Sequence, residues 1–268
     1  MLYFLAGLSL LLGALVVVMA GYIVRTRNAR KQRGLIGPWP IRKVAIDAFD
    51  EAFRCGPFGP GLAAEVRFVG RGNLPVTGGL GDVEYWILAV LAKRARRLFE
   101  FGTCTGRTTY MWAANAPPDA VVTTLTLAPG QVSQYAAGTD DDPAAARVAA
   151  EESGFSDFLY SGTPEASKIE QLYGDSKAFD ETPYVGRCDL VFVDGSHAYS
   201  YVKSDSEKAL RMVRPGGLVL WHDYHGPRRA PGVWRALNEL NRRHALVHLA
   251  GTNLVAYRRP AAGPTSGL

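Results

Sequence analysis

The sequence predicts an α/β protein with a Rossmann-like, doubly wound and mostly parallel sheet, preceded by a transmembrane helix. Short apolar runs alternate with helical patterns between residues 98 and 243, as in βαβ units. Two further strand-like runs, 246–249 and 254–257, flank a Gly-Thr-Asn turn and predict an antiparallel hairpin at the C-terminal edge of the sheet. The first 24 residues supply the third observation, because they are almost uniformly apolar.

The N-terminal segment 2–24 contains 23 residues without a charge, and about 20 apolar residues are enough for a helix to cross a bilayer. Five basic residues follow it between Arg25 and Arg33. By the positive-inside rule we expect a single-pass protein of the cell membrane whose body, including its catalytic domain, is cytoplasmic. A cleaved signal peptide is the alternative, but it would carry its positive charge before a shorter apolar stretch.

The rest of the chain divides into four parts by composition and periodicity. Residues 25–40 read as a basic juxtamembrane linker, because glycines and prolines break helices at its end. Residues 41–81 predict a short amphipathic helix over 41–54 and then an irregular segment rich in glycine and proline. Residues 82–258 form the main domain, and residues 259–268 predict a disordered tail.

The elements of the main domain follow from periodicity and capping. Asp82 predicts a helix start, and basic residues close that helix at its last turn. The run Asp189–Val193 is continuously apolar, as in a strand buried on both faces. Residues 128–180 are polar and mixed, which predicts helix with loops. The expected helices are 82–97, 105–114, 201–213 and 232–243, and the expected strands are 98–101, 121–127, 189–193 and 218–221.

Composition and charge exclude several classes of protein. Three cysteines without a CxxC pair argue against a disulfide scaffold and a zinc site. The net charge of +5 comes from the five basic residues at 25–33, which leave 25 basic against 25 acidic residues elsewhere. A neutral body with one basic cluster is not typical of a nucleic-acid-binding protein, so we expect no nucleic-acid partner.

Three strand ends carry polar groups, and ligands of such sheets bind at the carboxyl ends of the strands. The first is residues 100–106, a glycine-rich turn beginning with Glu100, although glycines also close many turns without a ligand. The second is residues 194–197, where Asp194 and His197 could hold a hard cation and move a proton. Helix capping by Asp194 is the structural alternative. The third is residues 221–225, with two imidazoles and Asp223, or else a polar surface loop.

These segments together resemble class I S-adenosylmethionine-dependent methyltransferases of the methyltransferase domain 24 type. The similarity covers roughly residues 80–258, so residues 82–258 are expected to be a methyltransferase domain. The segments that carry it, in chain order, are EFGTCTGRTT, QLYGDS, CDLVFVDGSHAYSYVKSD, RPGGLVLWHDY, GVWRALNEL and GTNLVAYR. The VDGSHAY and HDY segments are the specific part, whereas the glycine turn is common to the whole superfamily.

The resemblance implies a role for each matching position. The cofactor S-adenosylmethionine would be bound by Glu100, Gly102, Thr103, Gly106, Thr126, Asp175 and Asp194. Glu100, Gly102 and Gly106 would surround its methionine and ribose parts, and Asp175 would lie near the adenine. Related sugar O-methyltransferases imply Mg²⁺ on Asp194 and Asp223, with His197 taking the proton from a substrate hydroxyl.

Two residues depart from the pattern of the superfamily. Thr126 stands where an acidic residue usually binds the ribose hydroxyls. A charged acceptor forms stronger hydrogen bonds than a hydroxyl, so the exchange should weaken cofactor binding by about 1–2 kcal/mol. Cys104 replaces a glycine that is common in the first turn.

The leading functional prediction is a membrane-anchored O-methyltransferase acting on a small-molecule or lipid-linked acceptor. A catalytically degenerate relative that serves as a membrane-associated binding or scaffold protein is the alternative, because of Thr126. A nicotinamide-dependent dehydrogenase is disfavoured, because residues 102–107 read GTCTGR and lack the GxGxxG spacing. The sequence leaves the acceptor and the oligomeric state open.

Overall fold

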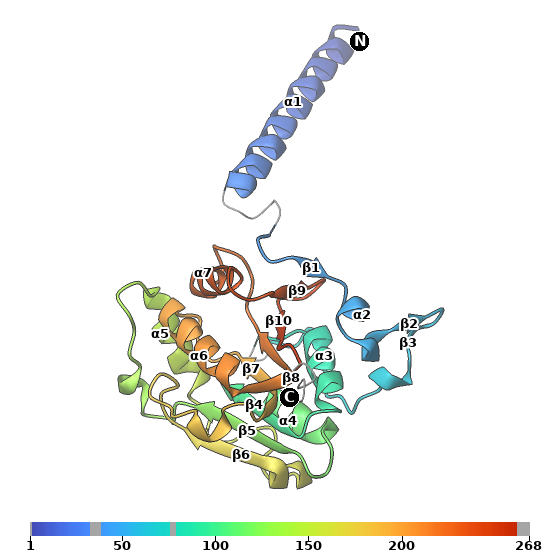
Figure 1. Cartoon of the computed structure of the whole chain (residues 1–268). Coiled ribbons are helices and arrows are strands. Elements are labelled where there is room, and N and C mark those ends of the chain that lie inside the picture. The colour runs from blue at the N-terminus through green and yellow to red at the C-terminus, as the bar shows by residue number, and fades with distance from the viewer. Residues whose placement is uncertain (1, 33–38, 76–78, 262–268) are drawn as a thin grey trace, which may run out of the picture.

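The computed structural model describes residues 2–32, 39–75 and 79–261 (Figure 1). Its main sheet has eight strands in the order β1-β9-β10-β8-β7-β4-β5-β6. Five neighbouring strands are parallel: β4 (Arg97–Phe101), β5 (Val121–Thr126), β6 (Ile169–Tyr173), β7 (Cys188–Val193) and β8 (Val213–Trp221). The predicted mostly parallel, Rossmann-like sheet is therefore confirmed.

The C-terminal hairpin is also present, with an additional strand outside it. β9 (Val247–Leu249) and β10 (Val255–Arg258) pair antiparallel, and β10 pairs antiparallel with β8. The short strand β1 (Lys43–Val44) runs parallel to β9 and occupies the edge. A two-residue strand leaves no periodic signal in the sequence, and the predicted helix over 41–54 is replaced by β1 and two short helical turns.

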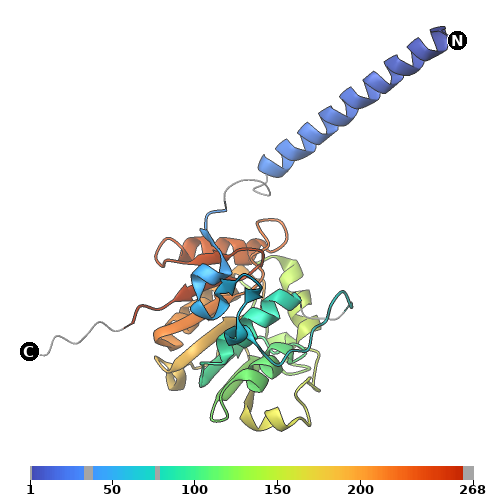
Figure 2. The ribbon, with the colours of Figure 1, turned by 90° about the vertical axis from the view of Figure 1, so that its right-hand side faces the viewer.

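Helices cover both faces of the sheet, because successive strand residues point to opposite sides. On one face, Leu98 and Phe192 pack with the helices α3 (Asp82–Ala92) and α4 (Arg107–Asn115). On the other face, Phe99 and Val191 pack with α6 (Tyr199–Met212) and α7 (Pro231–Leu240). The two apolar cores confirm the doubly wound arrangement, which the two views in Figures 1 and 2 show.

The remaining elements are short and belong mainly to segments expected to be irregular or mixed. They are α2 (Ile46–Phe49), η1 (Glu51–Phe53), β2 (Cys55–Gly56), β3 (Gly59–Pro60), η2 (Leu62–Ala64), η3 (Val132–Gln134), α5 (Pro143–Glu152), η4 (Pro164–Lys168) and η5 (Thr182–Tyr184). β6 lies in the stretch predicted as helix and loops. Glu170 and Gln171 interrupt its apolar residues and none of its five residues is buried, so its sequence lacks the apolar run that marks the other parallel strands.

The N-terminal segment is helical but does not support a membrane anchor. α1 (Leu2–Gln32) continues through the basic residues that were expected to begin a linker. Over the residues whose side chains the structure describes, no helix has the unbroken apolar length that a membrane crossing requires. The predictions of a transmembrane helix over 2–24 and of a single-pass protein of the cell membrane with a cytoplasmic catalytic domain are therefore wrong. Residues 33–38 of the predicted linker and 262–268 of the predicted tail lie outside the described residues.

Candidate active site

The loops that follow β4, β7 and β8 meet at the carboxyl edge of the sheet. The backbone N–H of Gly102 donates to the carbonyl of Leu125 at 2.8 Å, and that of Asp194 donates to the carbonyl of Phe101 at 2.9 Å. The N–H of His222 donates to the carbonyl of Val193 at 3.2 Å. The three strand ends singled out in the sequence are thus adjacent in space.

Gly102 is the point of closest approach between two of these loops. Its φ of +101° is a conformation that favours glycine. A Cβ atom at this position would lie 2.3 Å from the carbonyl oxygen of Asp194 and 2.6 Å from the Cα of Gly195. A residue with a side chain would therefore push the first and second loops apart.

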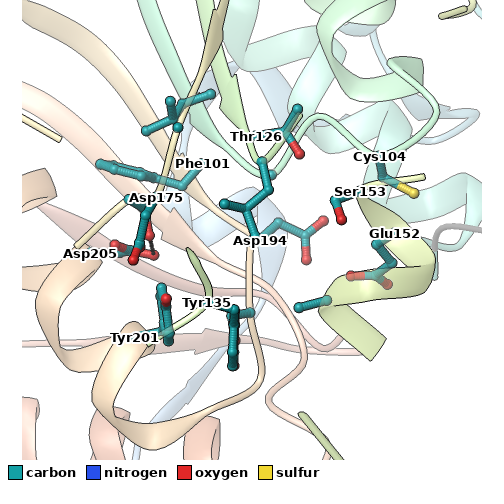
Figure 3. A pocket seen from close by; sticks show the side chains of 18 residues that line it. Phe101, Cys104, Thr126, Tyr135, Glu152, Ser153, Asp175, Asp194, Tyr201 and Asp205 are labelled. Atoms are coloured by element: carbon teal, nitrogen blue, oxygen red, sulfur yellow. Dashed lines mark hydrogen bonds between the residues drawn. The ribbon is translucent and has the colours of Figure 1, made fainter. Parts of the chain in front are cut away.

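A pocket lies between these loops and is called the main pocket here (Figure 3). Cys104, Glu152 and Ser153 line one end of it, and Asp175, Tyr201 and Asp205 line the other. Asp194 lies between the two ends. Its lining comes from the carboxyl ends of β4, β5, β6 and β7 and from the helices α5 and α6, which is where this class of sheet binds its ligands.

Asp194 also belongs to a group of ionisable side chains beside the main pocket, the Asp–His cluster, made of Asp194, His197, His222 and Asp223. The Nδ1 atom of His222 lies 3.2 Å from Oδ1 of Asp194 and 3.2 Å from Oδ1 of Asp223. The Nε2 atom of His197 lies 2.6 Å from Oδ2 of Asp223. Asp194, His197 and Asp223, predicted separately from two motifs, are thus brought together.

The Asp–His cluster has a donor set that suits a divalent cation. One ligand atom each from Asp194, His222 and Asp223 lie within 4.8 Å of one another. Carboxylate oxygens are ligands for Mg²⁺ and Mn²⁺, and an imidazole nitrogen adds affinity for transition metals. The two predicted metal ligands, Asp194 and Asp223, therefore fit the group, and His222 is a third candidate ligand.

Glu84 of α3 holds His222 from the side opposite the two aspartates. Its Oε2 lies 3.2 Å from Nε2 of His222 and accepts a hydrogen bond from the N–H of Gly81 at 2.8 Å. Its Oε1 accepts from the N–H of Asn253 at 2.6 Å, in the β9–β10 turn. Glu84 and His222 are 4% and 3% exposed. A carboxylate on the far nitrogen of an imidazole fixes the orientation of the ring, as it does for metal-binding histidines.

The carboxylates around the two imidazoles favour their protonated forms. Burial alone lowers the pKa of His197, but the hydrogen bond to Asp223 and its charge outweigh it and raise the pKa to about 9. Burial likewise opposes protonation of His222, yet the charges of Asp223 and Asp194 raise its pKa well above the usual range. Without a bound cation, the positive charge of protonated His197 and His222 offsets the negative charge of the aspartates in the cluster.

Backbone strain marks two residues of the site. Asp223 has a φ of +60° and Cys104 a φ of +45°, a region that side-chain-bearing residues seldom adopt. The ring of Tyr224, the next residue, is stacked on Trp234 with centroids 4.8 Å apart, and Trp39 packs against both. This aromatic packing fixes the chain next to Asp223. The left-handed backbone at Cys104 explains why glycine is common there in the superfamily.

Glu100 is not at the surface of the main pocket, although it was expected to surround the cofactor. It lies on the same face of β4 as Leu98, under α4, and is 1% exposed. Its Oε2 accepts hydrogen bonds from the hydroxyls of Thr109 and Thr124, the latter at 2.7 Å. Burial raises its pKa to about 8. The structure places Glu100 as a support beneath the first turn.

The other predicted cofactor residues divide into pocket lining and support. Gly102, Thr126, Asp175 and Asp194 line the main pocket. Thr103 is 3% exposed, and its hydroxyl lies 2.8 Å from that of Thr124. Gly106, with a φ of +73°, is the N-cap of α4, where a Cβ atom would lie 2.7 Å from the ring of Tyr160.

The sequence analysis gave no role to three polar residues of this region. His222 was within the quoted HDY segment, directly before Asp223, so its position offered a signal. Glu152, at the end of α5, lines the main pocket, and burial together with the charge of Asp194 raises its pKa to about 7. Asp205 lies within α6 and also lines the pocket. Glu152 lies in no motif, whereas Asp205 is the last residue of the CDLVFVDGSHAYSYVKSD segment but follows no strand end, so no role was assigned to either.

The matched family agrees with this geometry. Residues 99–224 match the methyltransferase domain 24 family, described as a methyltransferase domain. This range contains the C-terminal part of β4, the Asp–His cluster and all the predicted cofactor residues. A search of curated proteins found no match.

Several solved structures of similar fold are described as O-methyltransferases. The O-methyltransferase NovP is 15% identical with a TM-score of 0.51, over 67% of this chain and 81% of that one. TomG from Streptomyces achromogenes, an O-methyltransferase of tomaymycin synthesis in complex with SAM, is 18% identical with a TM-score of 0.46, over 70% and 84%. An O-methyltransferase from Bacillus cereus in complex with SAH is 18% identical with a TM-score of 0.46, over 69% and 84%.

The fold and the family match define the class of protein. The sheet order, the glycine turn after β4 and the pocket at the carboxyl edge are consistent with the class I S-adenosylmethionine-dependent methyltransferases that the sequence resembles. Residues 99–224 match the methyltransferase domain 24 family, and this match together with the fold supports an S-adenosylmethionine-dependent methyltransferase. The prediction drawn from the sequence motifs is confirmed.

Proposed function

We propose that this protein transfers a methyl group from S-adenosylmethionine to a hydroxyl oxygen of a small molecule, with the help of a divalent cation such as Mg²⁺. The observation that carries the proposal is the position of Asp194, which lines the main pocket and also belongs to the Asp–His cluster. A cofactor in the pocket and an acceptor at the cluster would meet at this residue. The lipid-linked acceptor was inferred from the membrane anchor, and we no longer expect it.

The main pocket offers the cofactor a path along the edge of the sheet. The methionine part would lie at the end lined by Cys104, Glu152 and Ser153, close to the turn at Gly102. The ribose would lie over Thr126, and the adenine at the end lined by Asp175. The sulfonium would then lie near Asp194, whose carboxylate favours the positive charge of the donor.

The acceptor hydroxyl needs to lose a proton as the methyl group arrives. His197 is the base in this proposal, because its ring is fixed by Asp223 at the edge of the cluster and its side chain is 32% exposed. A cation on Asp194, Asp223 and His222 would lower the pKa of the hydroxyl and favour neutral His197. Alignment of oxygen, methyl and sulfur supplies the rest of the rate enhancement.

Calorimetry with the cofactor tests the first part of the proposal. We expect the full chain to bind S-adenosylmethionine and S-adenosylhomocysteine saturably, with a Kd in the micromolar range of about 1–100 μM, as Thr126 supplies no charge to the ribose. The absence of heat with both ligands, in a protein whose circular dichroism shows a folded α/β domain, would contradict it.

The metal site is tested by titrating the apo protein with Mg²⁺ and with Mn²⁺. Replacing Asp223 by Asn should weaken binding of both ions by at least about 100-fold, because it removes a charged ligand. Asp157→Asn is the matched control, since Asp157 is exposed and lies outside both the pocket and the cluster. Equal metal affinity of the Asp223 variant and the wild type, or full methyl transfer in excess EDTA, would reject the cation.

A further inference from the structure

Asp205 is a buried carboxylate in the main pocket that the proposed reaction does not use. The residue is 1% exposed, and its Oδ2 accepts a hydrogen bond from the hydroxyl of Ser176 at 3.1 Å. Its Oδ1 is buried and has no hydrogen-bond partner among the described residues. Buried carboxylate oxygens are almost always satisfied, so an unpaired one on a residue that lines a ligand pocket points to a donor that the ligand brings.

The neighbouring cation does not supply that donor. Lys208 lies one turn further along α6, but its ammonium donates to the backbone carbonyls of Ser176, Lys177 and Phe179. These three bonds use the full donor capacity of an ammonium group. Burial, reinforced by the charge of Asp175, raises the pKa of Asp205 to about 7. A donor from a ligand would therefore satisfy an oxygen for which the described residues offer no partner.

The position of Asp205 indicates which part of the cofactor brings the donor. Asp175 and Asp205 lie together at one end of the main pocket, whereas Cys104 and Glu152 line the other end, and Asp194 lies between them (Figure 3). The sulfonium must approach the Asp–His cluster, so the end with two acids receives the group furthest from the methyl, the adenine. Adenine presents an exocyclic amine with two N–H donors, and ionised carboxylates only accept.

We infer that Asp205 is a specificity-determining residue that, together with Asp175, accepts the exocyclic amine of the adenine ring. Each carboxylate takes one of the two N–H groups of the amine. A purine with an oxygen at this position presents a single acceptor to two carboxylates that also accept, and the site rejects it. The inference rests on the proposed binding of S-adenosylmethionine. It adds Asp205 as a residue that recognises the adenine base of this cofactor.

The experiment compares S-adenosylhomocysteine with S-inosylhomocysteine, in which the amine is replaced by oxygen, by calorimetry on the full chain. We expect the wild type to prefer the adenosyl compound by at least about 100-fold, since a site built around a donor rejects the analogue lacking it. Asp205→Asn keeps the shape of the side chain and can turn an amide N–H toward the oxygen. The preference should then fall below about tenfold, with weaker adenosyl and stronger inosyl binding.

A second ligand tests the wild-type protein without any substitution. S-adenosylhomocysteine methylated on the exocyclic amine has one donor instead of two, and we expect its affinity to be at least about tenfold lower. Asp157→Asn controls for the loss of a surface charge and should leave all three affinities unchanged.

Three results would overturn the inference. Equal binding of the adenosyl and inosyl compounds by the wild type would show that no residue reads the amine. An Asp205→Asn variant that keeps the full preference, while Asp175→Asn loses it, would assign the reading to Asp175 alone. Failure of S-adenosylhomocysteine itself to bind would reject the proposed function together with this inference, whereas the first two results leave the proposed function intact.

Discussion

Replacing Gly102 by alanine should destabilise the protein by more than about 3 kcal/mol and reduce cofactor affinity by at least about 100-fold. The added Cβ would lie 2.3 Å from the carbonyl oxygen of Asp194 and 2.7 Å from its carbonyl carbon. Both are backbone atoms and cannot turn away as a flexible side chain would. The loops after β4 and β7 would have to separate, and they form the floor of the main pocket. Thermal unfolding and calorimetry with S-adenosylhomocysteine measure the two effects.

Gly130 provides the matched control, because it shares the unusual backbone conformation without the close contact. Its φ is +87°, and no heavy atom lies within 4 Å of an added Cβ. Gly130→Ala should therefore cost only the strain of a left-handed residue, about 1–2 kcal/mol, with cofactor binding unchanged. Similar losses for the two variants would show that backbone conformation alone, and not the contact with Asp194, explains the effect at Gly102.

Replacing His197 by glutamine should lower kcat by about 10²–10⁴-fold with little change in the affinity for S-adenosylhomocysteine. Glutamine can still hydrogen-bond to Asp223 but cannot take a proton from the acceptor. His197 belongs to the Asp–His cluster and does not line the main pocket, so the substitution removes no contact with the cofactor. The measurement uses whichever compound of a panel of hydroxylated small molecules the wild type methylates.

A second variant separates the chemistry of the ring from the position of the loop. Gly232 of α7 packs on the backbone of the loop that carries His197. A Cβ atom added at Gly232 would lie 2.2 Å from the carbonyl oxygen of His197. Gly232→Ala should displace the loop and reduce both stability and kcat. His197→Gln should reduce kcat alone. Wild-type kcat in the glutamine variant would remove His197 from the role of base.

The sequence was most informative where a strand ends in a polar residue. Asp194 and Asp223 each follow an apolar run, and parallel strands bring their carboxyl ends to one edge. The structure accordingly places both aspartates within 3.2 Å of the same atom of His222. Their juxtaposition needed only the order of strands and helices along the chain.

The orientation of Glu100 could also have been predicted from alternation. Phe99 and Phe101 face the core that α6 and α7 cover, so Glu100, between them, faces α4. We instead expected Glu100 to contact the cofactor, because the family resemblance implied that role at the glycine turn. By contrast, nothing local in the sequence connects Glu84 with His222, which are 138 residues apart. Glu84 occupies the first turn of a helix, where acidic residues are common because they interact favourably with the helix dipole.

The N-terminal prediction failed for a different cause. The apolar run Leu2–Val24 predicted a helix correctly, and α1 begins at Leu2. A transmembrane helix also needs a long, continuously apolar stretch. Over the residues whose side chains the structure describes, no helix has one. In the stretch 128–180 the structure has a helix, α5, as expected, but β6 was not predicted, because none of its residues is buried and no strand pattern marks it.

The cysteine at the first turn has a consequence for an enzyme that holds an alkylating cofactor. Cys104 lines the end of the main pocket where the methionine part would bind, and burial with the nearby charge of Glu152 raises its pKa to about 12. Sulfur attacks a methyl donor as the thiolate, and near pH 7 about one such group in 10⁵ is ionised. The burial that raises the pKa of Cys104 should thus disfavour methylation of its sulfur by the bound cofactor.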